Sequence, residues 1–267
     1  MLGKMLKYEV MITAHYFLPL FAGALLFSVI YRLFGNVFSN ALNWISGLLI
    51  FFEIVLIIAL AVMTVVITIQ RFYKNLLGSE GYLMFTLPVS THYNILSKLL
   101  IAMLWNIAAL LITALSIFIM ASYGNIAEII SGLWQSFYEA LNMQGLNPIL
   151  LLCEWIILGL LSVAGNILAL YLAMSIGQLA NVHKFMATFG AYVGIQFLLV
   201  IGTVILGSIM RKLPASFFHT LSRWFGSLSS VATIHLVTLI IGLATLAGGV
   251  IYYFITHWLL KHKLNLT

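Results

Sequence analysis

The chain has 267 residues, of which 63% are hydrophobic and 7% are charged, and its formal net charge is +6. Soluble domains carry about 25% charged residues, and one core of this length could not hide so much apolar surface from water. The composition therefore excludes a soluble domain and predicts an all-α membrane protein, while no cluster of basic and aromatic residues points to nucleic acid.

About 20 consecutive apolar residues cross the hydrocarbon core of a bilayer. Six stretches reach this length and predict a single transmembrane domain over 1–267. Before the first stretch, Leu2, Met5, Leu6 and Val10 fall near one helical face, which predicts an interfacial helix over 2–14. We expect no cleavable signal peptide, because the first apolar stretch is long. The predicted spans are 16–34, 45–70, 95–122, 149–178, 184–210 and 232–260.

Lys and Arg are enriched in cytoplasmic loops. With both termini inside, eight of the 12 Lys and Arg residues lie on the cytoplasmic side. The sequence thus predicts a multi-pass protein of the cell membrane with cytoplasmic N- and C-termini. The last outer loop departs from the trend, because it carries Arg211, Lys212 and Arg223.

Two loops predicted to lie outside have apolar residues at helical spacing. One set follows the third span and the other follows the fifth, where Pro214 suits a first helical turn. These segments are either interfacial helices or re-entrant helices that close the outer mouth of a pathway. In the second case an outer gate or contact surface would include Arg211, Lys212, Phe217, Arg223 and Trp224. The apolar positions are Ile126, Ile129, Ile130, Leu133, Trp134, Phe137 and Leu141, then Leu213, Phe217, Leu221, Trp224, Phe225 and Leu228.

The inner loop over 71–98 is too polar to span the membrane and too apolar for a solvated linker. Ser79 and Glu80 can begin a short helix, and Pro88 ends it. Ser90 and Thr91 then open the third spanning helix. The short helix is either a docking element for a cytoplasmic partner or an interfacial connector. Its apolar residues are Tyr82, Leu83, Met84, Phe85 and Leu87.

At these residues the chain resembles the ABC-2 type permease family of ATP-driven exporters. The matching features are the basic end of the second span (Arg71 and Lys74), the pair Glu80–Gly81, the turn Leu87-Pro88-x-Ser90, and Lys98 at the start of the third span. Lys7-Tyr8-Glu9 and the stretch from Phe17 to Leu20 also look like this family. In layout the chain is similar to permeases of exporters for phenol-soluble modulins and other toxic peptides.

The resemblance implies a type V exporter-like fold, with a cytoplasmic coupling helix between spans two and three. It implies two permease copies, as a homodimer or a related heterodimer, in the plasma membrane of a bacterium and in contact with lipid. Two cytoplasmic ABC ATPase subunits would bind ATP and Mg and dock on the coupling helix. The substrates would be amphipathic or antimicrobial peptides. The implied docking residues are Glu80, Gly81, Tyr82, Leu83, Met84, Phe85, Leu87 and Pro88.

The chain lacks G-x-x-x-x-G-K-[ST], so we expect no ATPase activity, no catalytic residue and no cofactor of its own. Seven scattered histidines without H-x-x-x-H spacing predict no metal site. The rival hypotheses are a secondary transporter or channel, and an intramembrane enzyme that uses the late His235. No nucleophile motif supports the enzyme.

Two acidic residues fall within predicted spans, Glu53 in the second and Glu154 in the fourth. Ionisable groups at membrane depth are candidate functional residues. Arg32, near the outer end of the first span, could pair with either acid, or the three residues could line an exit path.

Small and amide residues also recur within the spans. We expect Asn106, Asn166 and Gln196 to form hydrogen bonds between helices, and the small residues to let helices approach closely. The small residues are Gly165, Ala169, Ala173 and Gly177 in the fourth span and Gly190 and Gly194 in the fifth.

Overall fold

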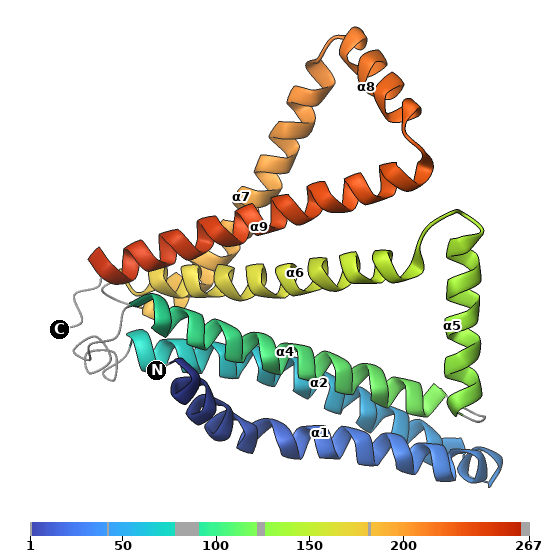
Figure 1. The fold of residues 1–267 in the computed structure, drawn as a ribbon. Coiled ribbons are helices and arrows are strands. Elements are labelled where there is room, and N and C mark those ends of the chain that lie inside the picture. Colours follow the sequence, from blue (N-terminus) through green and yellow to red (C-terminus); the bar gives the residue numbers. More distant parts are fainter. Residues whose placement is uncertain (1, 42, 78–90, 122–125, 181–182, 263–267) are drawn as a thin grey trace. The chain divides into compact units, whose positions relative to one another are not determined.

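A computed structural model describes residues 2–41, 43–77, 91–121, 126–180 and 183–262 (Figure 1). All regular structure in these ranges is helical. The helices are α1 (Leu2–Ala41), α2 (Asn43–Phe72), the π-helical turn η1 (Tyr73–Leu77), α4 (Thr91–Ala121), α5 (Ile126–Asn142), α6 (Pro148–Gly177), α7 (Lys184–Lys212), α8 (Ala215–Ser227) and α9 (Ser230–His262).

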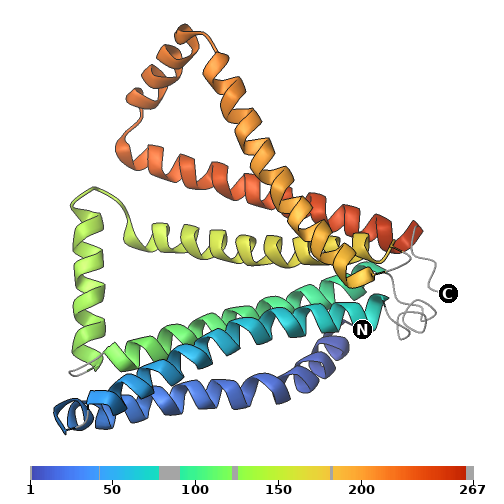
Figure 2. The ribbon, with the colours of Figure 1, turned by 180° about the vertical axis from the view of Figure 1, so that it is seen from behind.

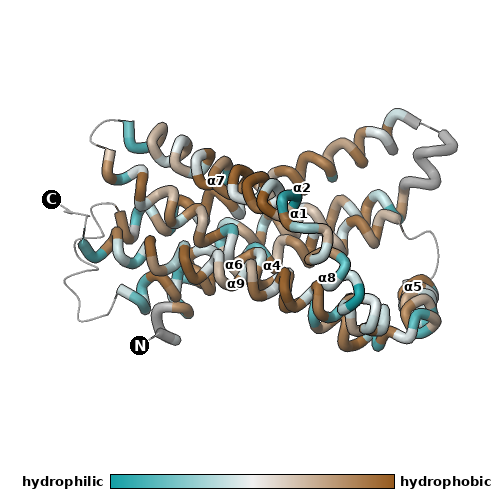
Figure 3. Tube along the Cα trace, turned by 90° about the horizontal axis from the view of Figure 1, so that it is seen from above, coloured by the Kyte–Doolittle hydropathy of each residue, from teal (hydrophilic) through white to brown (hydrophobic). Residues whose placement is uncertain are grey.

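Six of these helices, α1, α2, α4, α6, α7 and α9, are long and apolar enough to cross a membrane. Figure 3 shows that apolar residues dominate their length. The prediction of an all-α, multi-pass membrane protein is confirmed as far as the number, length and composition of the helices go. Each predicted span falls inside one of the six helices to within a residue at either end.

The N-terminal segment differs from the prediction in one respect. The expected interfacial helix over 2–14 and the first span are parts of one helix, α1, which bends in its N-terminal half (Figure 1). Pro19 lies inside α1. Proline removes one helical hydrogen bond and its ring presses on the preceding turn. Pro19 therefore bends α1 but does not end it.

The two amphipathic loop segments are helices, as predicted. They form α5 and α8, and α8 begins directly after Pro214. Pro214 itself is extended, with ψ 147°, so it precedes the first helical turn rather than occupying it. Thr91 opens α4, where the sequence predicted a helix start.

The chain divides into two compact units, 1–136 and 137–267, and the boundary falls within α5. In the first unit, α1 packs against α2 and α4. In the second unit, α6 packs against both α7 and α9. Figure 2 shows that α7 and α9 diverge toward α8, which joins their ends.

Helix α6 starts at a strong sequence signal. The side chain of Asn147 accepts hydrogen bonds from the backbone N–H groups of Ile149 and Leu150, at 3.1 and 3.3 Å. Pro148 occupies the first helical position, where its missing N–H has no helical partner to lose. The preceding turn requires Gly145, whose φ of 73° is unfavourable for residues with a Cβ.

The second unit is built on two parallel helices, α6 and α9. Glu154 contacts Thr238, Leu158 lies against Gly242, and Gly165 lies against Gly249. The partners in each pair are separated by the same number of positions along the chain. The two helices therefore run in one direction in a fixed register through this contact, as the fourth and sixth spans of a membrane protein must.

Candidate functional site

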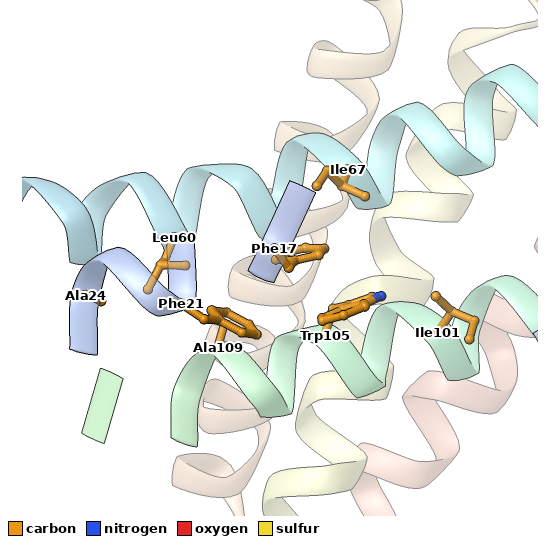
Figure 4. Close-up of a cluster of buried hydrophobic side chains, with 8 residues drawn as sticks. All are labelled: Phe17, Phe21, Ala24, Leu60, Ile67, Ile101, Trp105 and Ala109. Carbon is orange, nitrogen blue, oxygen red and sulfur yellow. The ribbon is translucent and has the colours of Figure 1, made fainter. Parts of the chain in front are cut away.

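The core of the first unit forms where α1, α2 and α4 meet (Figure 4). The ring of Phe17 stacks on the indole of Trp105, with centroids 4.6 Å apart and planes 11° apart. The ring centroid of Phe21 lies 6.0 Å from that of the same indole. The buried members of this cluster are Phe17, Phe21, Ala24, Leu60, Ile67, Ile101, Trp105 and Ala109.

A polar network continues this core toward the N-terminal end of α1. The indole N–H of Trp105 donates to Thr13 Oγ1 at 2.6 Å, and the Thr13 hydroxyl donates to the Glu9 carbonyl at 2.7 Å. The carboxylate of Glu9 forms an ion pair with the ammonium group of Lys98. The side chains of Lys98 and Glu9 are only 2% and 12% exposed, so the pair is shielded from solvent.

We name the region around this ion pair the α1–α4 corner, defined by Glu9, Thr13, Asn94, Lys98 and Trp105. Two further polar residues of α4 are buried, Ser97 next to Lys98 in the sequence and Asn94 one helical turn before it. The end of α2 and the π-helical turn are also well packed, with Phe72, Leu76 and Leu77 buried. Both segments that lead into residues 78–90 are thus anchored in the protein interior.

The predicted coupling residues lie outside the described residues. These are Glu80, Gly81, Tyr82, Leu83, Met84, Phe85, Leu87 and Pro88. The structure describes the flanking segments, η1 before them and α4 after them. The role of 79–88 stays a prediction.

Glu53 is buried in α2 and is only 2% exposed. The side-chain hydroxyl of Ser116, on α4, donates to the Thr113 carbonyl at 3.1 Å, and neither carboxyl oxygen of Glu53 has a hydrogen bond of good geometry within the described residues. Arg32 lies on α1 and is half-buried. The predicted ion pair of Arg32 with Glu53 or Glu154 stays a prediction.

In the second unit, Glu154 forms a polar cluster with two residues of α9. His235 Nδ1 lies 2.7 Å from Glu154 Oε1, and the Thr238 hydroxyl lies 2.8 Å from Glu154 Oε2. With Glu154 ionised, the carboxylate can only accept, so both neighbours donate to it, and the Thr238 hydroxyl also lies 2.8 Å from the His235 carbonyl. The side chains of His235 and Glu154 remain 24% and 27% exposed. We call these three residues the Glu154 cluster.

The Glu154 cluster stands at one end of a groove between α6 and α9. This groove has a volume of about 300 Å³ and is otherwise apolar. It is lined by Glu154, Ile157, Leu158, Leu161, Thr238, Leu239, Gly242, Leu243 and Leu246.

Farther along α6, a second groove of about 370 Å³ lies between α6, α7 and α9. Asn166, Gln196, Thr245 and Tyr252 give it a more polar lining. The described hydrogen bonds of Asn106 and Asn166 run within their own helices, to the carbonyls of Ala102 and Ser162 at 2.8 and 2.9 Å. Gln196 faces the same groove as Asn166.

One of the small residues of α6 lies at a close contact with α7. A Cβ added to Gly177 would lie 2.1 Å from Thr188 Oγ1 and 2.6 Å from the Thr188 backbone. The Cα of Gly165 lies 3.9 Å from a Cβ added to Gly249, whereas a Cβ added to Gly165, Gly190 or Gly194 itself meets nothing within 4 Å. The small residues thus serve packing inside the second unit at Gly165 and Gly177.

The residues proposed for an outer gate are all exposed. Arg211 and Lys212 end α7, and Phe217, Arg223 and Trp224 project from α8. Phe217 and Trp224 are 42% and 50% exposed. The structure places these side chains at the α7–α8 end of the second unit, and their role as a gate stays a prediction.

Sequence patterns named several of these residues but not their contacts. Glu9 and Lys98 each belong to a motif of the family resemblance, and the structure joins them into one ion pair. Glu154 and His235 were noted separately. Glu154 was noted as an acid at membrane depth and His235 as a late histidine, and each lies about one and a half helical turns from the start of its helix. Thr13 and Thr238 carried no signal, since threonines are common in apolar helices.

Within the described ranges, no group of three or more His, Cys, Asp or Glu side chains is arranged to hold a metal ion. Comparison with protein-family models, curated proteins and solved structures finds no significant match to this chain.

Proposed function

We propose that the chain is the membrane-spanning permease subunit of an ATP-driven exporter of the ABC-2 type. Six helices able to span a membrane and the motif residues of 71–98 support this function. Amphipathic peptides or similar hydrophobic molecules are the proposed cargo, because the spans carry few charged groups.

The α1–α4 corner is the observation that carries the proposal. A coupling helix transmits force only if the segments on both sides of it are fixed to the spanning helices. The buried Glu9–Lys98 pair fixes the start of α4 to α1, while Phe72, Leu76 and Leu77 anchor the segment before residue 78. A movement of residues 78–90 would therefore move α1, α2 and α4 rather than bend a loose loop.

The proposal requires a separate motor, because the sequence contains no phosphate-binding loop. A pair of ATPase subunits would bind below two permease copies, and closure on ATP would displace the coupling helices. This predicts that the chain purifies with an ABC ATPase in equal amounts. Purification of the chain alone with full transport activity would refute the proposal.

A sharper test replaces Tyr82 or Phe85 with Asp in the full chain. We expect ATPase recovery to fall at least about tenfold, because a charge placed in a desolvated hot spot costs 2 kcal/mol or more. Met143→Asp is the matched control, since Met143 is 90% exposed in the turn before α6 and is predicted to face outside. Membrane insertion should be normal in all three variants. Equal ATPase recovery from all of them would argue against docking at 79–88.

The Glu154 cluster favours one alternative, a proton-coupled secondary transporter. A carboxylate hydrogen-bonded to a histidine within spanning helices is typical of a proton relay. Proteoliposomes separate the two functions. Uptake driven by a proton gradient without ATP would support the relay, and uptake that needs the ATPase and ATP would support the exporter.

A further inference from the structure

The α6–α9 groove joins one charged group to an apolar wall. Glu154 stands at its end, and Leu or Ile side chains from both helices line most of the remainder. Its volume of about 300 Å³ falls at the lower end of ligand pockets, which span roughly 300–1,000 Å³. Such a groove fits a small ligand with a single polar end.

The charge of the groove selects a cation. Glu154 is the only acidic residue between positions 140 and 267 of the sequence. Its carboxylate offers about four lone pairs, and His235 and Thr238 use one on each oxygen. The remaining lone pairs can accept from an ammonium group, and the side chain is 27% exposed, so a ligand can reach it.

The polar and apolar ends of the groove are also arranged as an amphiphile in a bilayer requires. Glu154 lies about 9 Å from the start of α6, near one end of the span. The apolar wall runs about 10 Å deeper, from Glu154 to Leu161 on α6, with Leu239 to Leu246 facing it on α9. A bound amphiphile would place its head near the membrane interface and its tail along the helices.

We propose that the α6–α9 groove binds an amphipathic organic cation, an amine on an alkyl chain, as cargo. The inference rests on the proposed export function and names a substrate class for it. The ammonium group donates to the Glu154 carboxylate, and the chain lies between Leu158, Leu161, Leu239 and Leu243. A neutral or anionic amphiphile of the same length binds poorly, because the neutral head brings no positive charge to the Glu154 carboxylate and the anionic head is repelled by it.

The test uses the purified full chain in phosphatidylcholine nanodiscs, with no ATPase and no nucleotide. The probe is decylamine with a photoreactive diazirine in its chain, and mass spectrometry maps the crosslinks. We expect saturable labelling of 157–161 and 239–246, and about tenfold to a hundredfold weaker labelling by the matching decanol probe. Because the ATPase is absent, this result is independent of the coupling test.

Three variants sharpen the result. Glu154→Gln should weaken amine labelling by about tenfold to a hundredfold and leave alcohol labelling unchanged, because it removes only the charge. Leu243→Trp keeps the carboxylate but fills the groove, so it should abolish labelling even if Glu154→Gln folds poorly. Ile240→Trp is the control, since Ile240 is 52% exposed on the same helix and does not line the groove.

The proposal is overturned by any of three results: equal labelling with amine and alcohol, crosslinks confined to other helices, or no effect of Leu243→Trp. Nanodiscs that contain phosphatidylethanolamine supply a competing membrane amine. If this lipid displaces the decylamine probe at the groove, the site holds a structural lipid and the cargo assignment fails.

Discussion

Trp105 shows how a polar aromatic side chain is satisfied inside an apolar helix bundle. Its rings stack on Phe17 and its N–H donates to Thr13, so neither part of the indole is left without a partner. A buried N–H without an acceptor costs about 1–3 kcal/mol. Thr13 lies one helical turn after Glu9, the acid of the ion pair, and its hydroxyl supplies the acceptor that the buried indole of Trp105 requires.

Thr13→Val tests this dependence, because valine keeps the shape of threonine and removes the hydroxyl acceptor. We expect the free energy of unfolding to fall by about 1–3 kcal/mol. Thr203→Val is the control, since its hydroxyl is exposed and bonds only to the carbonyl of Val200 in its own helix. Reversible denaturation in mixed micelles, followed by circular dichroism, measures both. Equal losses in the two variants would contradict the role of Thr13.

The Glu9–Lys98 pair permits a double-mutant cycle. Glu9→Gln or Lys98→Met alone leaves a buried group without its partner and should cost about 3–5 kcal/mol. The double variant should lose less than the sum, because no uncompensated charge remains. Unfolding free energies of the four proteins give the coupling energy. A coupling near zero would show that the pair does not fasten α1 to α4.

At the scale of elements, the contact of α6 with α7 depends on one glycine. Gly177→Ala should destabilise the protein, because its Cβ would overlap the Thr188 backbone, which cannot move away as a flexible side chain can. Gly159→Ala on the same helix meets nothing within 4 Å and should be neutral or stabilising by up to about 1 kcal/mol. Thermal melting of both variants compares the two sites. A stable Gly177→Ala protein would show that α6 and α7 are not in close contact there.

Helix α8 distinguishes the interfacial and re-entrant hypotheses for the outer loops. Trp224 is half exposed on α8 and reports its depth in the bilayer. In a variant that retains Trp224 as its only tryptophan, we expect stronger quenching by lipids brominated near the head group than by lipids brominated near the chain end. This follows from an amphipathic helix lying in the interface. Stronger quenching by the deep bromines would favour a re-entrant helix.

Much of this architecture followed from the sequence, and the reasons differ from element to element. Long apolar runs fix a helix in lipid, because every backbone group must be bonded internally. The six helices therefore appeared where the hydropathy placed them, and Asn147-Pro148 marks the start of α6. Partner choice does not follow from such runs. Leucine-rich faces fit many neighbours, so the contacts Glu9–Lys98 and Glu154–His235 required the folded structure.

Across the whole molecule, the predicted topology has a direct test. An even number of spans returns the chain to the side on which it started, and the distribution of Lys and Arg predicts the cytoplasm for that side. Cys153 is the only cysteine, so Cys153→Ser gives a background without thiols. In this background a membrane-impermeant maleimide applied to intact cells should label Ser229→Cys and spare Gly3→Cys. The reverse pattern would invert the topology, and with it the predicted location of 78–90.

Because α6 and α9 are in fixed register, each position along the groove lies at a known depth from Glu154. Within the groove, Glu154 contacts Thr238, and about one turn deeper Leu158 lies against Gly242. Enlarging a residue at successive steps would stop a bound alkyl chain at successive lengths. The longest amine that still binds each variant would then report, to within about one helical turn, how deep the tail of a ligand reaches.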